Sequence, residues 1–316
     1  MDISSLISPL MDMNLNFLKL GFIFMTVVIV ILGGLMNTVE QYLPAFLAQT
    51  FRYGKFAYQG RSPRIKPIEV PKRWFRHFYV FAAINTLSAT LLAFMAYFFG
   101  RRPHPWLLFM LDLLASRDRK ATVSGLSVLL ALLLLTLQAW HRFYETWFVS
   151  VFSNGRMNLS HYLVGYIHYF GSVAAILSEA PGFISGKDDH ASVQLSDLTL
   201  LNVLGCILFL YACYRQYKVG ILLANLRKNE KGQVVRYDHV IPRGDWFELV
   251  STPHLFAEIL MYLALTCVLW GASTWPAVFA WVFCNQVETG LLTHWWYQSK
   301  FKSYPKERKA IIPFVL

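Results

Sequence analysis

The sequence predicts an all-α, polytopic membrane protein with about seven transmembrane helices and a polar pocket open to the cytosol. Composition is the first reason: 56% of the 316 residues are hydrophobic and only 15% are charged, whereas soluble domains carry about 25% charged residues. The second reason is that apolar stretches recur along the chain and the charged residues gather between them. The third is a mean hydropathy of +0.42.

The predicted spans approach the roughly 20 residues that a helix needs to cross a bilayer. They are residues 17–35, 78–99, 121–140, 162–177, 198–214, 255–270 and 275–292. We expect the first span to be retained, because no basic region precedes it and no small-residue cleavage site follows it.

Lys and Arg are shared unevenly between the loops, and this predicts the orientation. Residues 52–76, 215–248 and 300–309 are rich in Lys and Arg. Cytosolic loops carry such an excess, so we expect a luminal N-terminus, a luminal loop at 187–189 and a cytosolic C-terminus. One loop disagrees, because its basic residues fall on the luminal side: Arg101, Arg102, Arg117, Arg119 and Lys120. The apolar piece WLLFMLDLL within that loop predicts a short interfacial helix.

The net charge of +11 does not indicate a nucleic-acid partner, because the basic residues form neither an arm nor a zinc-finger pattern. Anionic lipid headgroups of the membrane and an anionic cofactor are the expected partners. The cysteines show no CxxC spacing and lie inside predicted spans: Cys206, Cys213, Cys267 and Cys284. We therefore expect neither a disulfide framework nor a metal site.

Polar residues in the last two predicted spans follow two helical stripes. The first is His254, Glu258 and Tyr262, and the second is Gln286, Gly290, His294 and Tyr297. An ionisable group within a membrane span costs about 2–3 kcal/mol on insertion scales and usually has a function. Facing stripes would form the polar pocket, with Gly290 leaving room for a close approach to the backbone. Alternatively, His254 and Glu258 only satisfy each other, and His294 and Tyr297 belong to an interfacial belt.

Two further groups of charged residues flank the expected pocket. If the third helix continues beyond its apolar stretch, Arg142 and Glu145 lie on one side of it, although a lone Arg–Glu pair is usually a surface pair worth under about 1 kcal/mol. The connector after the fifth span supplies Lys218, Arg227 and Arg243. Arg binds phosphate with two parallel hydrogen bonds and Lys adds a point charge. On composition alone, the connector also agrees with an ordinary cytosolic loop.

Several short motifs occur in an order that resembles the steroid 5α-reductase family. They are LRKNEKG, IPRGDWFELVS, AEI, HWWYQSKF and the ending YPKERKAIIPFVL. The longer stretches VPKRWFRHFYV and YETWFVSVFSN look like one branch of that family, the polyprenol (polyprenal) reductases. The likeness spans Phe51 to Leu316. It implies seven membrane helices, residence in the endoplasmic reticulum membrane and NADPH bound from the cytosolic side.

The resemblance also implies which residues surround the cofactor. Carried over by motif, these are Arg142, Arg156, Gln216, Arg227, His254, Glu258, Tyr297 and Arg308, to which we add Lys218 and Arg243 of the connector. The expected catalytic residues are His294, Tyr297 and Glu258. The chain then divides into residues 1–76 with the first helix and a basic loop, residues 77–196 with the central helices, and residues 197–316 as the cofactor-binding region.

Two positions depart from the family pattern. His254 stands where many family members have Asn, which affects the contact expected there. The steroid-reducing members carry a Gln-Glu pair before a Leu-Pro turn, whereas this chain has Gln41–Tyr42, with Glu40 one place out of register. Recognition of a steroid carbonyl is therefore poorly supported.

Electronics favour a polyprenal over a polyprenol as the immediate substrate, because hydride from NADPH attacks an alkene only when the alkene is polarised. The expected function is reduction of the α-isoprene double bond of this long-chain isoprenoid lipid, on the route to dolichol and protein N-glycosylation. A donor must stabilise the enolate oxygen by about 3–4 kcal/mol, and the candidates are Tyr297, His294, Glu40 and Tyr42. The alternatives are a 3-oxo-5-alpha-steroid 4-dehydrogenase, an isoprenylcysteine-type membrane methyltransferase and a non-enzymatic lipid-binding membrane protein.

Overall fold

The computed structural model describes residues 9, 11–51, 68–153, 155–186 and 192–316. Within these residues the fold is almost entirely helical, and the sheet consists of two short strands. This confirms the predicted all-α, polytopic fold. The basic residues expected at 52–66 and the luminal loop expected at 187–189 lie outside the described residues.

Seven long helices coincide with the seven predicted spans. They are α2 (Phe17–Thr38), α4 (Phe75–Phe99), α6 (Gly125–Tyr144), α7 (Leu159–Ser178), α8 (Leu200–Asn225), α9 (Pro253–Val268) and α10 (Trp275–Lys300). The shorter elements are α3 (Ala45–Phe51), α5 (Pro105–Ala115), η1 (Glu40–Tyr42), η3 (Lys72–Trp74), η4 (Glu145–Val149), η5 (Leu195–Asp197), η6 (Asp245–Glu248), β1 (Glu69–Pro71) and β2 (Arg156–Asn158). The segments long and apolar enough on their own to cross a membrane are Phe17–Thr38, Lys72–Phe99, Gly125–Val149 and Leu200–Asn225.

Local sequence explains where several helices begin. A capping box starts α8: the Thr199 hydroxyl accepts from the Asn202 amide at 3.1 Å, and the Asn202 side chain accepts from the Thr199 amide at 2.9 Å. At the start of α6, the Ser124 hydroxyl accepts from the Ser127 amide at 3.2 Å. Pro253 lies in the first turn of α9, where its missing N–H leaves no hydrogen bond unmade.

Three helices extend beyond the apolar stretches that predict them. α8 continues past Tyr214 to Asn225, and α10 continues past Leu292 to Lys300. α6 continues, as expected, into the π-helical turn η4. Polar residues lower the hydropathy of these extensions without ending the helix. The same extensions carry Arg142, Gln216, Lys218, His294 and Tyr297.

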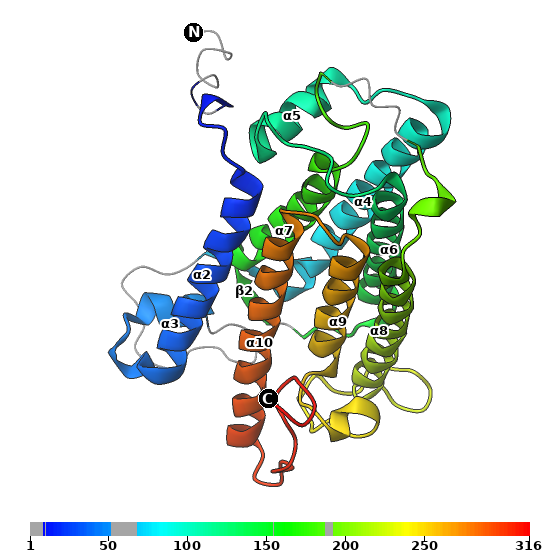
Figure 1. The fold of residues 1–316 in the computed structure, drawn as a ribbon. Coiled ribbons are helices and arrows are strands. Elements are labelled where there is room, and N and C mark those ends of the chain that lie inside the picture. The colour runs from blue at the N-terminus through cyan, green and yellow to red at the C-terminus, as the bar shows by residue number, and fades with distance from the viewer. Residues whose placement is uncertain (1–8, 10, 52–67, 154, 187–191) are drawn as a thin grey trace.

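The beginning of α2 and the C-terminus lie at opposite ends of the helix bundle (Figure 1). The end that holds α5 and the start of α2 is called the N-terminal end below. The other end holds the C-terminus, the ends of α8 and α10 and the start of α9, and is called the C-terminal end. This separation agrees with the predicted odd number of spans.

The basic loop that disagrees with the predicted orientation, residues 101–120, forms ion pairs and hydrogen bonds within the protein. Arg119 donates from Nε to Asp112 at 2.8 Å and from Nη1 to the Ser178 carbonyl at 3.1 Å. Arg117 forms a 3.7 Å ion pair with Asp12. These carboxylates offset part of the positive charge at the N-terminal end. The apolar piece of the same loop forms α5, the short helix that the sequence predicts.

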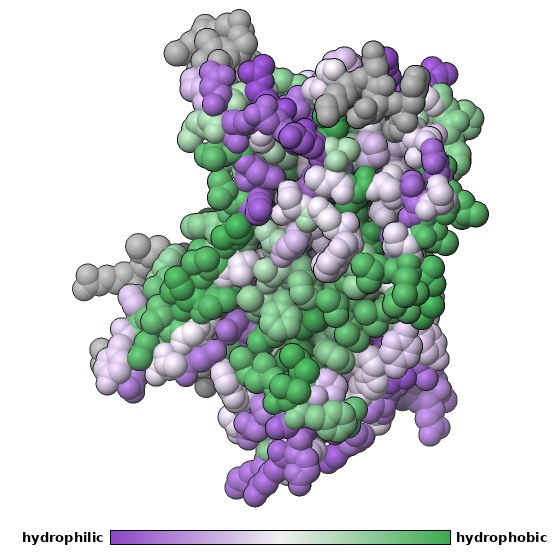
Figure 2. Space-filling model, in the orientation of Figure 1, coloured by the Kyte–Doolittle hydropathy of each residue, from purple (hydrophilic) through white to green (hydrophobic). Residues whose placement is uncertain are grey.

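Apolar side chains form a band across the middle of the face shown in Figure 2, and hydrophilic side chains lie above and below it. α2 contributes to exposed apolar surface, with Phe24 68% and Ile31 55% exposed. Such a band matches the hydrocarbon layer of a membrane. α2 packs against α10, where the Asn37 side chain donates to Glu288 at 3.1 Å.

Candidate active site

Six polar side chains from five helical segments meet inside the bundle and form what we call the interior polar cluster. They are Tyr79 of α4, Gln138 and Arg142 of α6, Glu145 of η4, Gln216 of α8 and Glu258 of α9. Gln216 is at the centre and is 1% exposed. Its carbonyl oxygen accepts from Gln138 at 2.7 Å, while its amide nitrogen donates to Glu258 at 3.2 Å and to the His254 carbonyl at 3.1 Å. One amide therefore joins three helices.

Arg142 and Glu145 are hydrogen-bonded to each other, and Arg142 also donates to the Tyr79 hydroxyl at 3.2 and 3.3 Å. Glu145 is only 5% exposed. A Cβ atom at Gly220 would lie 2.6 Å from a Glu145 carboxylate oxygen, so α8 approaches this carboxylate only because residue 220 is glycine. The Arg142–Glu145 pair is therefore largely buried, unlike the usual surface pair, because η4 turns Glu145 inward against α8.

Tyr262 extends the stripe of His254 and Glu258 but turns toward α7. Its hydroxyl lies 2.6 Å from His168 Nε2. Its ring stacks on Trp275, with 5.9 Å between centroids and 3° between planes. The stripe that begins at His254 thus ends in contacts with α7 and α10.

Three cations at the C-terminal end have no carboxylate partner among the described residues. They are Lys72, Arg76 and Arg227, and we call them the basic cluster. Burial lowers the pKa of the Arg227 guanidinium, although nearby tyrosines partly oppose the change, and its Nη1 donates to the Val151 carbonyl. The charges of Lys72 and Arg227 repel each other.

Arg76 stacks its guanidinium over the rings of Trp147 and Phe152, at 5.4 and 5.2 Å from their centroids. Its Nε is buried and has no hydrogen-bond partner within the described part of the chain. Arg76 follows Lys72 by four residues, and Lys72 lies close enough to Arg227 for their charges to interact. A buried donor and two cations without an acidic partner among the described residues suit an anion.

The C-terminal tail closes the other side of this end. Ser251 Oγ lies 2.7 Å from His294 Nδ1, and Thr252 Oγ1 donates to the Ala310 carbonyl at 2.9 Å. Arg308 is 2% exposed and donates to the Pro242 carbonyl at 3.1 Å. These contacts fasten the ending YPKERKAIIPFVL to the start of α9.

Tyr297 connects the tail with the basic cluster. It is 6% exposed and stacks on Tyr304, with centroids 5.4 Å apart and ring planes at 10°. It also interacts electrostatically with Arg227 and Arg308. A phenol in this position lies beside positive charge from two different segments.

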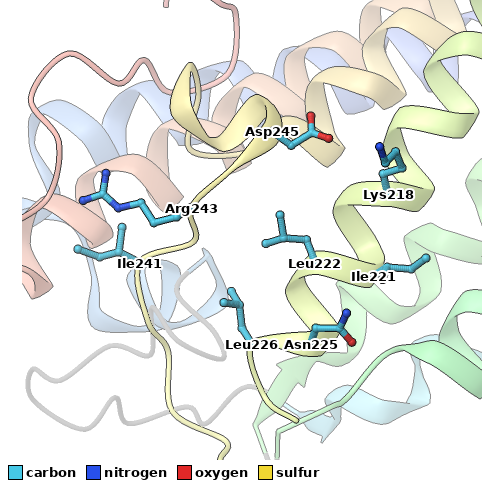
Figure 3. Close-up of a pocket in the computed structure, with 8 residues that line it drawn as sticks. All are labelled: Lys218, Ile221, Leu222, Asn225, Leu226, Ile241, Arg243 and Asp245. Atoms are coloured by element: carbon cyan, nitrogen blue, oxygen red, sulfur yellow. The ribbon is translucent and has the colours of Figure 1, made fainter. Parts of the chain in front are cut away.

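The structure brings most of the predicted site residues into two neighbouring groups. The first group is the interior polar cluster with its neighbour His254, and it contains Arg142, Gln216 and Glu258. The second group is where the basic cluster meets the tail, and it contains Arg227, His294, Tyr297 and Arg308. Arg156 pairs with Pro71 in the β1–β2 sheet, so its backbone lies next to Lys72, but its side chain is 60% exposed and forms a 3.3 Å ion pair with Glu69. Lys218 and Arg243 line a pocket beside α8 (Figure 3), and Arg243 shares Glu248 with Arg308, each at 3.7 Å.

Gly290 permits the close approach to the helix backbone that the sequence predicts. A Cβ atom there would lie 3.0 Å from Ile311 and 3.1 Å from the Thr252 hydroxyl. The glycine does permit a close approach to the α10 backbone, but the approaching group is the protein's own C-terminal tail. The expected close approach at Gly290 is therefore confirmed, and Ile311 and Thr252 make it.

Several site residues have no predicted role from the sequence. They are Lys72, Arg76, Tyr79, Gln138, Ser251 and Tyr304. Lys72, Arg76 and Tyr79 all lie in VPKRWFRHFYV, so the motif that resembles the family already contained the signal. Gln138 was detectable as a lone amide within an apolar span.

Among the described residues, no group of three or more His, Cys, Asp or Glu side chains is arranged to hold a metal ion. Glu40 and Tyr42, the remaining candidate donors, lie on η1, and Tyr42 is 79% exposed.

The seven-helix fold, with polar and basic clusters inside one end of the bundle, defines an integral membrane protein whose interior holds a group of charged side chains. Residues 182–316 match the family described as 3-oxo-5-alpha-steroid 4-dehydrogenase. A polyprenal reductase of Drosophila melanogaster is 40% identical over 308 residues, which cover 96% of this chain and 94% of that protein.

Two further polyprenal reductases are similar over most of their length. The protein of Caenorhabditis elegans is 36% identical over 84% of this chain and 85% of its own. The protein of Homo sapiens is 34% identical over 86% of both chains. The chain therefore belongs to the steroid 5α-reductase family and is an oxidoreductase, and this membership implies a nicotinamide cofactor.

Proposed function

We propose that the protein reduces the α-isoprene double bond of a polyprenal with NADPH, in the endoplasmic reticulum membrane and on the route to dolichol for protein N-glycosylation. The observation that carries this proposal is the similarity to polyprenal reductases over 84–96% of the chain. A steroid substrate is not favoured, because those relatives are named for a polyprenal. A methyltransferase or a non-enzymatic lipid-binding protein does not agree with membership of a reductase family.

The clusters at the C-terminal end support a site for NADPH. The basic cluster, with a buried donor and no carboxylate partner among the described residues, suits the phosphates, and Arg227 is the central residue of this assignment. Glu258 offers a carboxylate for the nicotinamide carboxamide or a ribose hydroxyl, and Gln216, whose amide bonds to Gln138, Glu258 and the His254 carbonyl, orients it. The remaining proposed contacts are Arg142, Arg156, His254, Tyr297 and Arg308.

The bound cofactor supplies hydride to the β-carbon of the unsaturated aldehyde, and the protein must stabilise the negative charge on the aldehyde oxygen. We assign this role to Tyr297, because its phenol lies beside Arg227 and Arg308. Both ring nitrogens of His294 already have neighbours, Ser251 at 2.7 Å and Gln298 at 2.9 Å. His294 therefore positions the tail and α10 around Tyr297, and Glu258 holds Gln216.

The Tyr297 assignment has its own test. Tyr297→Phe should lower kcat by about 100- to 1000-fold, as loss of one oxyanion donor does, and should raise the Kd for NADPH far less, because the ring that contacts the cofactor remains. Tyr304→Phe is the matched control, because it removes a hydroxyl from the ring stacked on Tyr297. Equal losses in both variants would assign the effect to packing of the tail.

The chemistry is tested with purified enzyme and NADPH that carries deuterium at the transferred position. With a polyprenal as substrate, one deuterium should appear on the β-carbon of the saturated aldehyde, a solvent proton should enter at the α-carbon, and NADP⁺ should form in equal amount. The corresponding polyprenol should remain unchanged. Saturation of the alcohol at a comparable rate, without any aldehyde, would contradict the mechanism.

A further inference from the structure

A pocket of about 330 Å³ lies at the N-terminal end of the bundle, where the start of α6, the start of α8 and the end of α9 meet. Asn202 of this pocket precedes Gln216 of the interior polar cluster by 14 residues on the same helix, which is about 21 Å along the helix axis. Ligand sites commonly span about 300–1,000 Å³, so a pocket of this size suits a compact headgroup. Its occupant is therefore a molecule other than the one that Gln216 and Glu258 hold.

A buried asparagine forms the floor of the pocket. Asn202 is 1% exposed, and its amide nitrogen donates to the Ser127 hydroxyl of α6 and to the Val268 carbonyl of α9, both at 3.0 Å. Its amide oxygen accepts from the Thr199 amide at 2.9 Å and from the Thr199 hydroxyl at 2.8 Å. The floor thus joins three helices with its hydrogen bonds made, and the groups left for a ligand lie around it.

Trp270 lines the pocket from the connection between α9 and α10. The next residue, Gly271, has a φ of +99°, and a Cβ atom there would lie 3.2 Å from the Thr122 carbonyl oxygen. This connection therefore packs against the segment before α6 because residue 271 is glycine. Trp270 remains 72% exposed, and no other aromatic ring of the described residues packs against it.

Asp197 supplies the charge of the pocket. It is partly buried, and no described residue forms an ion pair or a hydrogen bond with its carboxylate. Amide donors at the two helix starts, in contrast, are already engaged. Ser124 Oγ accepts from the Ser127 amide at 3.2 Å, and Thr199 Oγ1 accepts from the Asn202 amide at 3.1 Å. The pocket therefore offers hydrogen-bond acceptors and a negative charge, and this combination favours a cation over an anion.

A primary ammonium group matches these acceptors. It carries three hydrogen-bond donors, which the Asp197 carboxylate and the neighbouring Ser124 and Thr199 hydroxyl oxygens can accept. Its charge is also attracted to the face of an indole ring such as that of Trp270. A choline group would be attracted to the ring and the carboxylate but has no proton to donate to the hydroxyl oxygens.

Apolar surface leads from the pocket into the membrane. Leu201 lines the pocket, and Leu204, one turn further along α8, is 51% exposed. α8 is long and apolar enough to cross a membrane. A tryptophan at the end of a membrane helix is typical of the level of the lipid headgroups. The surroundings of the pocket therefore suit an ammonium group that is attached to a hydrocarbon chain.

We propose that this pocket binds the headgroup of phosphatidylethanolamine from the leaflet at the N-terminal end. The ammonium group lies between Asp197 and Trp270, the carbon atoms of the headgroup contact the aliphatic lining at Leu201 and Val268, and one acyl chain follows Leu204. The proposal does not depend on the reductase activity, because the pocket is distant from the interior polar cluster.

Purified full-length protein in detergent tests the proposal by native mass spectrometry and by thermal shift. The separate probes are dioleoyl phosphatidylethanolamine, dioleoyl phosphatidylcholine, dioleoyl phosphatidic acid and soluble phosphoethanolamine. Phosphatidylethanolamine should bind most tightly of the three lipids. Phosphoethanolamine should give no shift at the same concentration, because it lacks the acyl chains.

Variants of the two ligand-binding side chains test the assignment of the ammonium group. Asp197→Asn keeps the size of the side chain but removes its charge, and it should weaken phosphatidylethanolamine binding by about tenfold. Asp197→Glu should recover most of the affinity. Trp270→Leu should weaken binding by about two- to fivefold, as loss of an exposed cation–π contact does.

Two matched controls alter the same residue types elsewhere. Asp238→Asn removes an exposed carboxylate of the connector at the C-terminal end, and Trp106→Leu removes an exposed tryptophan of α5. Neither should change lipid binding, and without added lipid every variant should unfold at the temperature of the unmodified protein. Four results would overturn the proposal: equally tight binding of phosphatidylcholine or phosphatidic acid, an equal shift by phosphoethanolamine, unchanged binding in both Asp197→Asn and Trp270→Leu, or equal losses in the controls.

Discussion

Replacing Glu145 with Gln should destabilise the protein by an amount that distinguishes a buried ion pair from a surface one. The side chains of Glu145 and Arg142 are 7% and 20% exposed, and Gly220 packs directly against the carboxylate. Glu145→Gln leaves Arg142 buried without its main partner. Removing one member of a buried pair costs about 3–5 kcal/mol.

The expected loss is at the lower end of this range, about 3 kcal/mol, for two structural reasons. Arg142 retains two hydrogen bonds to the Tyr79 hydroxyl. It also retains an electrostatic interaction with Glu258. The free energy of unfolding, measured by titrating SDS into the protein in mixed micelles, reports this loss directly.

A second Arg–Glu pair in the same chain provides the control. Arg156 and Glu69 are 3.3 Å apart with side chains 60% and 31% exposed, so Glu69→Gln should cost under about 1 kcal/mol. A double variant, Arg142→Met with Glu145→Leu, should recover part of the stability, because both charges are then removed. If Glu145→Gln and Glu69→Gln gave equal losses, the burial argument would be refuted.

Three further predictions address the cofactor, the N-terminal end and the orientation. Arg227→Ala should raise the KM for NADPH by about 10- to 100-fold, the equivalent of one charged hydrogen-bonding group, while Lys231→Ala leaves it unchanged, as steady-state kinetics can show. Glu179 loses solvation by burial but accepts hydrogen bonds from Thr122, Ser273 and Thr274, which together lower the pKa of its carboxyl group. The charged Glu179 carboxylate therefore contributes its full stabilisation above the ordinary Glu pKa, and this contribution disappears as pH falls through the lowered pKa. In Glu179→Gln, the free energy of unfolding should fall less steeply at acidic pH than in the unmodified protein. An unchanged acid dependence would contradict this. In sealed microsomes, Lys306→Cys should react with a membrane-impermeant thiol reagent and Arg117→Cys should not, and the reverse pattern would place the active site in the lumen.

The sequence by itself determined the membrane fold and the approximate position of every long helix. Hydropathy is a local property, and a bilayer accepts a spanning segment only when nearly every residue in it agrees, so each helix could be located from its own residues. The motifs YPKERKAIIPFVL and VPKRWFRHFYV likewise indicated the family before any contact was known. The sequence did not predict how far α8 continues beyond its apolar stretch, because the part of a helix outside the membrane has no apolar signature.

Only the tertiary structure decided which polar residues share a site. Glu145 is buried because α8 approaches it at Gly220, and Gly290 is covered by Ile311 of a tail that lies 21 positions later in the chain. Lys218 lies only two positions from Gln216 in the chain, yet it faces a different pocket on the other side of the helix. Contacts between helices depend on the rotation of each helix and on the packing of distant segments, and neither quantity is encoded in a local pattern of residues.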